Sequence, residues 1–343
     1  MSEINRRGSL EIKNCRAIGK RDYISPSFKS FHADCALFDV DGVILDTRRS
    51  YNSAIKKTVD FILEYITQKS YLKGLVTEDL ILKFRQTGGF NNDTDTSYAI
   101  TLSVLATHQK IVKHARKFLS SVSKNADETG IISVEKFLES YSYDVQKFKK
   151  MLFYPGPVGL SMLPTVFDEL FYGPELFKKR HRCEPKYYFG KPLIENDKLL
   201  VTRTTTEALL KRFNSNIAVV SGRSKLAAEY SLKPILDIFN QTACVFLEDE
   251  KREYAKPNPY ALKRAMGNMD VNTAIYAGDS TEDLLMARRT EKETGVKIAF
   301  VGIYGCSKQP ATMVRLFREN GANAIIESIN QLPYILNNVS AKM

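Results

Sequence analysis

Six short segments of this sequence are apolar at every position, and helical patterns separate the last five of them. The segments are 35–38, 217–220, 244–247, 274–277, 298–301 and 324–326. A strand that is covered on both faces is apolar throughout, whereas a half-exposed strand alternates. Short apolar runs that alternate with helices are typical of a parallel sheet with helices on both faces. We therefore predict an α/β fold built on a doubly wound parallel sheet, and we expect the first segment to join that sheet.

The chain between 48 and 203 has a different pattern. Its apolar residues recur three or four positions apart, which predicts amphipathic helices rather than strands. This spacing is clearest over 51–66, 111–122 and 162–170. We therefore predict a mostly helical domain, 48–203, inserted after the first strand. Two short apolar runs near its end, 187–189 and 199–201, fit either a hairpin or a simple return of the chain.

The remaining residues divide into a catalytic core and an extension. The core is expected to consist of 34–47 together with 204–343, and Thr204 followed by Glu207 predicts a capping box at its first helix. Residues 1–33 are polar and basic. We predict that they form an N-terminal extension in which Ser25-Pro26-Ser27 breaks any regular element.

The composition excludes several classes of protein. The 343 residues include 50 Lys and Arg against 39 Asp and Glu, a net charge of +11. The basic residues are not interleaved with aromatic ones, so no nucleic-acid partner is expected. No stretch approaches the ~18 apolar residues of a membrane span, so no membrane association is expected either. The five cysteines contain no CxxC pair, which favours a reducing compartment, and we predict a cytoplasmic protein. The sequence carries no pattern that fixes an oligomeric state.

Polar residues follow several of the predicted strands. Asp39 and Asp41 follow the first strand, Ser221-Gly222-Arg223 follows the second, and Asp279 follows the fourth. Ligands of open α/β sheets bind beyond the carboxyl ends of the strands, so we expect these side chains to converge. Two further candidates are Lys256, between the third and fourth strands, and Asp283, which lies four residues after Asp279 and is expected on one face of a helical turn.

Converging carboxylates repel one another unless a cation lies among them. Oxygen ligands without Cys or His indicate Mg²⁺, which also binds phosphate oxygens. In such a site Asp39 could attack phosphorus, and Asp41 could act as general acid and then as general base. Ser221 and Lys256 could hold the transferring phosphoryl group, and Gly222 and Arg223 are further candidates for contact with the phosphate or the substrate. Asp283 could support the metal from behind its ligands.

Four segments of the chain resemble the four motifs of the haloacid dehalogenase superfamily, in the same order. They are ALFDVDGVILDT, VVSGR, AKPNP and YAGDSTEDLLMA, and they cover 34–47 and 204–335. The resemblance implies a Rossmann-like core with a helical cap inserted after the first motif, and a hydrolase that uses Mg²⁺. It implies Asp39 as nucleophile, Asp41 as acid and base, and Asp279 as a metal ligand. It further implies that Asp41 contributes its main-chain carbonyl to the metal.

The resemblance says less about the cap. The insertion is longer than we expect of a helical cap in this family, and the cap usually selects the substrate. The segment 86–93 resembles a cap loop of the same subfamily, so Gly88, Gly89 and Asn91 are candidate substrate contacts. A plain helix-breaking loop would have the same residues.

Several residues also have simpler explanations. Ser221 could be an ordinary helix N-cap, Asp283 could be an acidic residue favoured near a helix N-terminus, and Arg223 is as well explained without a substrate contact as with one. For the whole chain, we expect a Mg²⁺-dependent phosphomonoester hydrolase acting on a small phosphorylated metabolite. A phosphomutase would have the same motifs, and a non-enzymatic phospholigand-binding protein is the alternative from another class. A dehalogenase has no need of Asp41, because a halide leaves without a proton.

Overall fold

The computed structural model describes residues 19, 21–70, 72–90, 92–108 and 110–340. The chain forms two compact units, one made of residues up to Thr47 together with those from Asp197 onward, and one made of Arg48–Asn196. We call them the core unit and the inserted unit. The sequence placed the return to the core at residue 204. In the structure the chain returns at Asp197. Lys198 and Leu199 already pair with residues 46 and 45, which lie just before the insertion.

The main sheet of the core unit has the order β1-β9-β8-β7-β2-β5-β6 over the described residues. Every neighbouring pair in it is parallel except β1 and β9. The strands are β1 (Tyr23–Ile24), β2 (Cys35–Phe38), β5 (Ile217–Ser221), β6 (Val245–Phe246), β7 (Thr273–Gly278), β8 (Lys297–Ile303) and β9 (Ala324–Ile326). The predicted apolar runs are therefore strands, and the predicted α/β fold with a doubly wound, mostly parallel sheet is confirmed.

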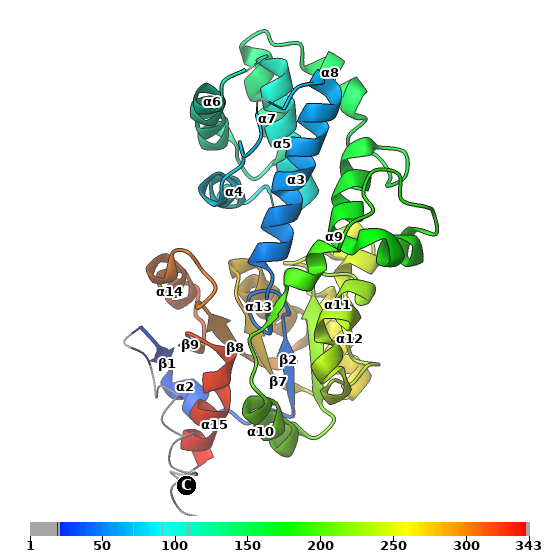
Figure 1. Cartoon of the computed structure of the whole chain (residues 1–343). Helices are drawn as coiled ribbons and strands as arrows, with labels where there is room; N and C mark the ends of the chain where they lie inside the picture. The colour runs from blue at the N-terminus through cyan, green and yellow to red at the C-terminus, as the bar shows by residue number, and fades with distance from the viewer. Residues whose placement is uncertain (1–18, 20, 71, 91, 109, 341–343) are drawn as a thin grey trace, which may run out of the picture. The chain divides into compact units, whose positions relative to one another are not determined.

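Helices cover both faces of this sheet (Figure 1). They are α2 (Pro26–Lys29), α10 (Arg203–Phe213), α11 (Lys225–Leu232), α12 (Tyr260–Met269), α13 (Thr281–Thr294), α14 (Pro310–Glu319) and α15 (Leu332–Ser340), with short 3-10 turns η3 (Lys233–Ile238), η4 (Leu247–Asp249), η5 (Arg252–Tyr254) and η6 (Ile329–Gln331). Burial of apolar side chains between helices and sheet is the main favourable contribution to such a fold.

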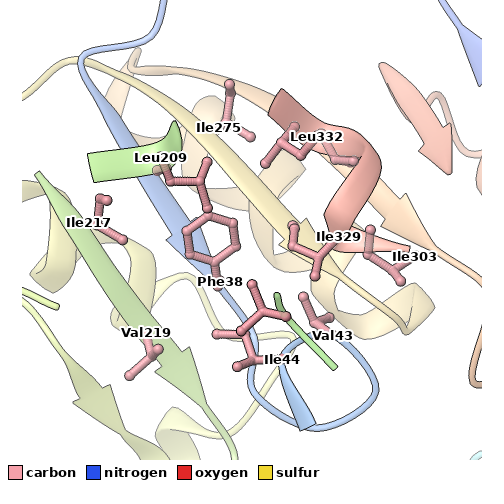
Figure 2. Packing of buried hydrophobic residues seen from close by; sticks show 14 of the residues in the cluster. Phe38, Val43, Ile44, Leu209, Ile217, Val219, Ile275, Ile303, Ile329 and Leu332 are labelled. Carbon is pink, nitrogen blue, oxygen red and sulfur yellow. The ribbon is translucent and has the colours of Figure 1, made fainter. Parts of the chain in front are cut away.

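Successive residues of each strand enter opposite cores. Ala36 and Phe38 belong to the core beneath α10 and α15, whereas Cys35 and Leu37 belong to the core beneath α12, α13 and α14. Figure 2 shows Phe38 among Leu209 and Ile44 in the first of these cores. This strict alternation in two buried faces explains why every residue of the strand is apolar.

The expectation that no regular element forms around Ser25-Pro26-Ser27 is wrong. Tyr23–Ile24 forms β1, which pairs antiparallel with β9, and Pro26–Lys29 forms α2. Ser25 is the N-cap, because its hydroxyl accepts a hydrogen bond from the backbone N–H of Phe28. Proline is tolerated at the first helical position, where its missing N–H would have no helical partner. The part of the extension before residue 19 lies outside the described residues.

The two places where the chain passes between the units lie side by side. The strands β3 (Leu45–Asp46) and β4 (Lys198–Leu199) form a separate antiparallel pair. The return segment was predicted to form either a hairpin with 187–189 or a simple return of the chain. The second prediction is correct, because residues 198 and 199 pair with residues 46 and 45 and not with 187–189. The predicted capping box is also wrong, because the N-cap of α10 is Thr202, whose hydroxyl accepts from the N–H of Thr205.

The inserted unit is helical, as the apolar spacing predicted. Its helices are α3 (Arg48–Thr67), α4 (Glu78–Arg85), α5 (Asp93–Ala106), α6 (Val112–Asn125), α7 (Ile131–Ser140), α8 (Val145–Leu152) and α9 (Met162–His181), followed by the 3-10 turn η2 (Leu193–Asn196). The central helix α5 packs against α3, α7 and α8, and nearly all of its side chains are buried. No helix among the described residues is long and apolar enough to cross a membrane.

Candidate active site

Asp39 and Asp41 follow β2 at the middle of the sheet. The backbone N–H of Asp39 donates to the carbonyl of Ala277 at 2.9 Å, which extends the pairing of β2 with β7 by one residue. The chain then turns tightly, because Gly42 N–H donates to the carbonyl of Leu45 at 2.8 Å. Asp39 is buried, and Asp41 is about one-third exposed. The local fold therefore fixes the backbone of both aspartates at the carboxyl end of the sheet.

Gly42 is required at this turn for two reasons. Its φ is +75°, a conformation that residues with a Cβ rarely adopt. A Cβ at Gly42 would also lie 1.9 Å from Oδ2 of Asp279. The absence of a side chain thus allows the loop after β2 to pass directly against the carboxylate that follows β7.

Lys256 lies between two carboxylates. Its ammonium is 2.8 Å from Oδ1 of Asp39 and 2.7 Å from Oδ1 of Asp283. All three side chains are close to fully buried, with exposed fractions of 11% for Lys256, 8% for Asp39 and 0% for Asp283. An ion pair that is shielded from water is stronger than a surface pair and fixes the geometry of its members. The structure thus brings together three of the residues that the sequence predicted for the site.

Asp283 holds the start of α13. Its Oδ2 accepts from the backbone N–H and the hydroxyl of Ser280, at 3.1 and 2.6 Å, in a capping box. Its Oδ1 accepts from the hydroxyl of Tyr276, in addition to the contact with Lys256. The expectation that Asp279 and Asp283 share one turn of a helix is wrong. The helix begins at Thr281 because Ser280 caps it, so Asp279 precedes the helix.

The side chains of Asp39, Asp279 and Asp283 can hold a metal ion. Each offers an oxygen atom, and these atoms lie within 4.8 Å of one another. The donor set consists only of carboxylates, which fits a hard cation such as Mg²⁺. The carboxylate of Asp41 is not in this group; the resemblance assigned its main-chain carbonyl to the metal.

The pKa values of these groups reflect the same crowding. Burial raises the pKa of Asp39 to about 7, although Lys256 lowers it, and the charges of Asp283 and Asp41 raise it further. Burial and the charges of Asp39 and Asp283 hold the pKa of Asp279 well above its usual value. Asp283 differs: burial opposes its ionisation, but Lys256, Ser280 and Tyr276 together lower its pKa. A cation among the three would remove the repulsion, so these residues fit the magnesium site predicted from the sequence.

Ser221 is the last residue of β5, and Gly222 follows it. The hydroxyl oxygen of Ser221 accepts from the backbone N–H of Arg223 at 3.2 Å, and the side chain is buried. It is not a helix N-cap, because Ser224 caps α11. Gly222 is exposed, and a Cβ there would meet no atom within 4 Å. Their contact with a phosphoryl group stays a prediction.

Arg223 is buried, with an exposed fraction of 1%. Its guanidinium Nη2 lies 2.7 Å from Oδ2 of Asp197, and its Nε lies 3.6 Å from Oδ1 of Asp41. The sequence left open whether Arg223 meets the substrate phosphate. The structure places its charge against two carboxylates of the protein.

The candidate substrate loop belongs to the inserted unit. Gly88 has a φ of +83°, and no atom lies within 4 Å of the place of its Cβ. Gly89 packs so closely on the loop at 127–130 that a Cβ would lie 2.3 Å from the carbonyl oxygen of Asp127. Tight packing therefore explains Gly89 without a substrate. Asn91 lies outside the described residues, and the role of this loop in substrate binding stays a prediction.

Two residues of the site were not predicted from the sequence. Tyr276 stands within an apolar strand, and its hydroxyl is directed to Asp283. A tyrosine in such a run was the available signal, because a buried phenol needs a hydrogen-bond partner. Asp197 stands in a polar turn after the insertion, where aspartate is common, so its pairing with Arg223 could be found only from the fold.

Comparisons with known proteins identify solved structures of similar fold. No curated protein matches the chain. Among solved structures, the chain is similar to phosphatase Tt82 from Thermococcus thioreducens, with 21% identity, a TM-score of 0.55, and coverage of 82% of this chain and 98% of that one. It is also similar to a structural-genomics target solved by X-ray crystallography, with 16% identity, a TM-score of 0.66, and coverage of 90% and 100%. Both similarities concern the fold.

A family model gives the identification. The model of the haloacid dehalogenase-like hydrolases matches residues 33–290. This range contains the loop after β2, the end of β5, Lys256 and the start of α13, and therefore every residue of the candidate site in the core unit. With most of the chain matched and the predicted motifs brought together at one end of the sheet, the protein belongs to the haloacid dehalogenase-like hydrolase family.

Proposed function

We propose that this protein is a Mg²⁺-dependent phosphomonoester hydrolase that works through an aspartyl-phosphate. One observation carries the proposal: Lys256 holds Asp39 at 2.8 Å, within reach of the carboxylates of Asp279 and Asp283. A nucleophilic carboxylate, a cation beside it and a group of carboxylates suited to a metal are the parts that phosphoryl transfer needs.

Asp39 supplies the nucleophile. One of its oxygens attacks phosphorus, the bond from phosphorus to the alkoxide oxygen breaks, and an acyl phosphate forms on Asp39. Asp41 donates a proton to the departing oxygen, so that an alcohol leaves. Asp41 then takes a proton from a water molecule, which attacks phosphorus. The bond from phosphorus to Asp39 breaks, inorganic phosphate is released, and Asp39 returns to its starting form.

The negative charge of the phosphoryl group needs positive partners. Lys256 is close to Asp39 and buried, so its ammonium acts at low local dielectric. Ser221 lies at the end of the neighbouring strand β5, and its hydroxyl can donate to a phosphoryl oxygen while its lone pair accepts from Arg223. Mg²⁺, when bound, neutralises the carboxylates and polarises the phosphoryl oxygens. Asp39 and Asp279 would hold it, together with the main-chain carbonyl of Asp41, and Asp283 would support the site while it holds Lys256.

The substrate class is a small phosphorylated metabolite. Phosphatase Tt82, a neighbour in fold, supports phosphate chemistry by its name, and the net charge of +11 favours anionic ligands. The groups that would meet the phosphoryl group are carboxylates, Lys256 and Ser221, which recognise phosphate rather than the rest of the substrate, so we assign the choice of substrate to the inserted unit. Cys35, Cys183 and Cys244 are free thiols, which supports the prediction of a cytoplasmic protein.

The test is a phosphatase screen with the full chain and Mg²⁺. Sugar phosphates, nucleotides and small acid phosphates are the substrates, release of inorganic phosphate is the readout, and Asp39→Asn is the control. Turnover that disappears in this variant supports the proposal. Turnover that appears only with a sugar bisphosphate activator would identify a phosphomutase instead. Saturable binding of phosphorylated compounds with no turnover of any of them would identify a binding protein.

A further inference from the structure

Arg223 is the largest fully buried side chain in the described part of the chain. A buried charge is costly unless other charges and hydrogen bonds compensate it. Two aspartates on different segments contribute to this compensation. Nη2 pairs with Asp197 at 2.7 Å, and Nε faces Asp41 at 3.6 Å. The arginine thus links Asp197 to the proposed general acid.

The Asp197 end of this link is buried and held by hydrogen bonds. Its side chain is only 3% exposed. Its Oδ2 accepts from Nη2 of Arg223 and also from the hydroxyl of Ser231 on α11, each at 2.7 Å. The guanidinium is planar, so a strong contact at Nη2 also fixes the direction of Nε. The backbone of Arg223 is held as well, because its N–H donates to Ser221.

The Asp41 end is different. Its carboxylate is about one-third exposed, and its contact with Nε is longer than a hydrogen bond. The loop around Asp41 fixes its backbone, but a side chain can still change rotamer. A fixed positive charge at 3.6 Å favours the rotamers that keep the carboxylate near it.

We infer that Asp197 and Arg223 are positioning residues for Asp41. They hold the carboxylate where it can donate a proton to the leaving oxygen, and Arg223 does not serve as a substrate ligand. This inference rests on the proposed function and adds to it. Asp197 is the first residue of the core unit after the insertion and directly precedes β4. The position of the acid is therefore determined by a residue at the crossing between the units.

The kinetic test uses Asp197→Asn in the full chain with Mg²⁺. Two aryl phosphates are compared: p-nitrophenyl phosphate, whose leaving group needs little protonation, and phenyl phosphate, whose leaving group needs more. We expect kcat/KM for phenyl phosphate to fall at least about tenfold more than for p-nitrophenyl phosphate. Asp41→Asn should change this ratio in the same direction and by more.

A merely structural role would not change the ratio. Partial unfolding lowers the concentration of active enzyme, so both substrates lose activity equally. The matched control is Asp22→Asn, because Asp22 also accepts side-chain hydrogen bonds within the core unit, from Tyr304 and Gln331, and its ratio should stay that of the wild type. An equal loss for both substrates in Asp197→Asn would overturn the inference.

A second measurement does not depend on activity. Crystal structures of the wild type and of Asp197→Asn should differ in the rotamer of Asp41, and an unchanged carboxylate would overturn the inference. If Asp197→Asn fails to fold, Ser231→Ala takes its place in both experiments, with a smaller change expected in the same direction. A wild type that cleaves no phosphomonoester would end the proposed function, and the crystal comparison would still decide whether Asp197 positions Asp41.

Discussion

The ammonium of Lys256 lies 2.8 Å from Oδ1 of Asp39, although the two residues are far apart in the sequence. The same ammonium also contacts Asp283. One buried cation thus joins the end of β2 to the start of α13. In the proposed reaction this contact directs the nucleophile and prepares a positive site for the phosphoryl group.

Replacement of the nucleophile should abolish turnover. Asp39→Asn keeps the size of the side chain, but an amide is a poor nucleophile. We expect kcat to fall by several orders of magnitude, with a circular dichroism spectrum like that of the wild type. Retention of more than about a tenth of the activity would rule out covalent catalysis by this residue.

Replacement of the acid should depend on the leaving group. Asp41→Asn should slow formation of the phospho-enzyme most for sugar phosphates, whose alkoxides need a proton, and less for aryl phosphates. Single-turnover kinetics with both substrate types measure this difference. If phosphorylation slows by the same factor for both, Asp41 is not the general acid.

The two carboxylates after β7 should respond differently to substitution. Asp279→Ala should raise the Mg²⁺ concentration needed for half-maximal activity far more than Asp283→Ala, because we place Asp279 against the metal and Asp283 behind it. Asp283→Ala should instead destabilise the fold by about 3 kcal/mol or more, since it removes a buried partner of Lys256. Metal titration and urea unfolding of both variants decide between these roles. An Asp279→Ala variant with near-normal activity and no change in metal requirement would contradict the magnesium site.

The metal-free protein should lose stability as the pH rises. The pKa of Asp39 is raised from 3.8 to about 7 by burial, so the folded state binds this proton more tightly than the unfolded state. The stability that the folded state gains by binding this proton is fully present below pH 3.8. It is lost as the pH rises through 7. In EDTA, the Tm of the wild type should therefore fall relative to that of Asp39→Asn between pH 4 and 8. A difference between the two Tm values that stays constant over this pH range would show that burial does not raise the pKa of Asp39.

The sequence predicted the buried strands of the sheet more accurately than its edge strand β1 and the end of the insertion. The apolar runs of β2, β5, β7, β8 and β9 are buried on both faces, and this environment leaves a clear pattern in the sequence. β1 and β4 have two residues each and little burial. Their positions depend on pairing with distant strands, which leaves no local periodicity, so the return at Asp197 and the edge strand were not predicted.

The candidate site shows the same division. Asp39, Asp41 and Asp279 follow strands and Ser221 ends one, so the topology of a parallel sheet is enough to place them at the same edge of the sheet. One partner of Arg223 is Asp197, on the segment that returns from the insertion. Such a contact between distant segments follows from the course of the chain in space, and nothing in the residues around either position indicates it.

The central claim is that phosphate is transferred to Asp39 itself. The most direct measurement is an acid quench of the Mg²⁺-loaded enzyme during turnover of a substrate found in the screen, followed by digestion and mass spectrometry of the peptide that contains Asp39 and Asp41. We predict a phosphoryl group on Asp39, absent in Asp39→Asn and without substrate. A phosphoryl group on another residue, or none while phosphate is released in a burst, would contradict the account.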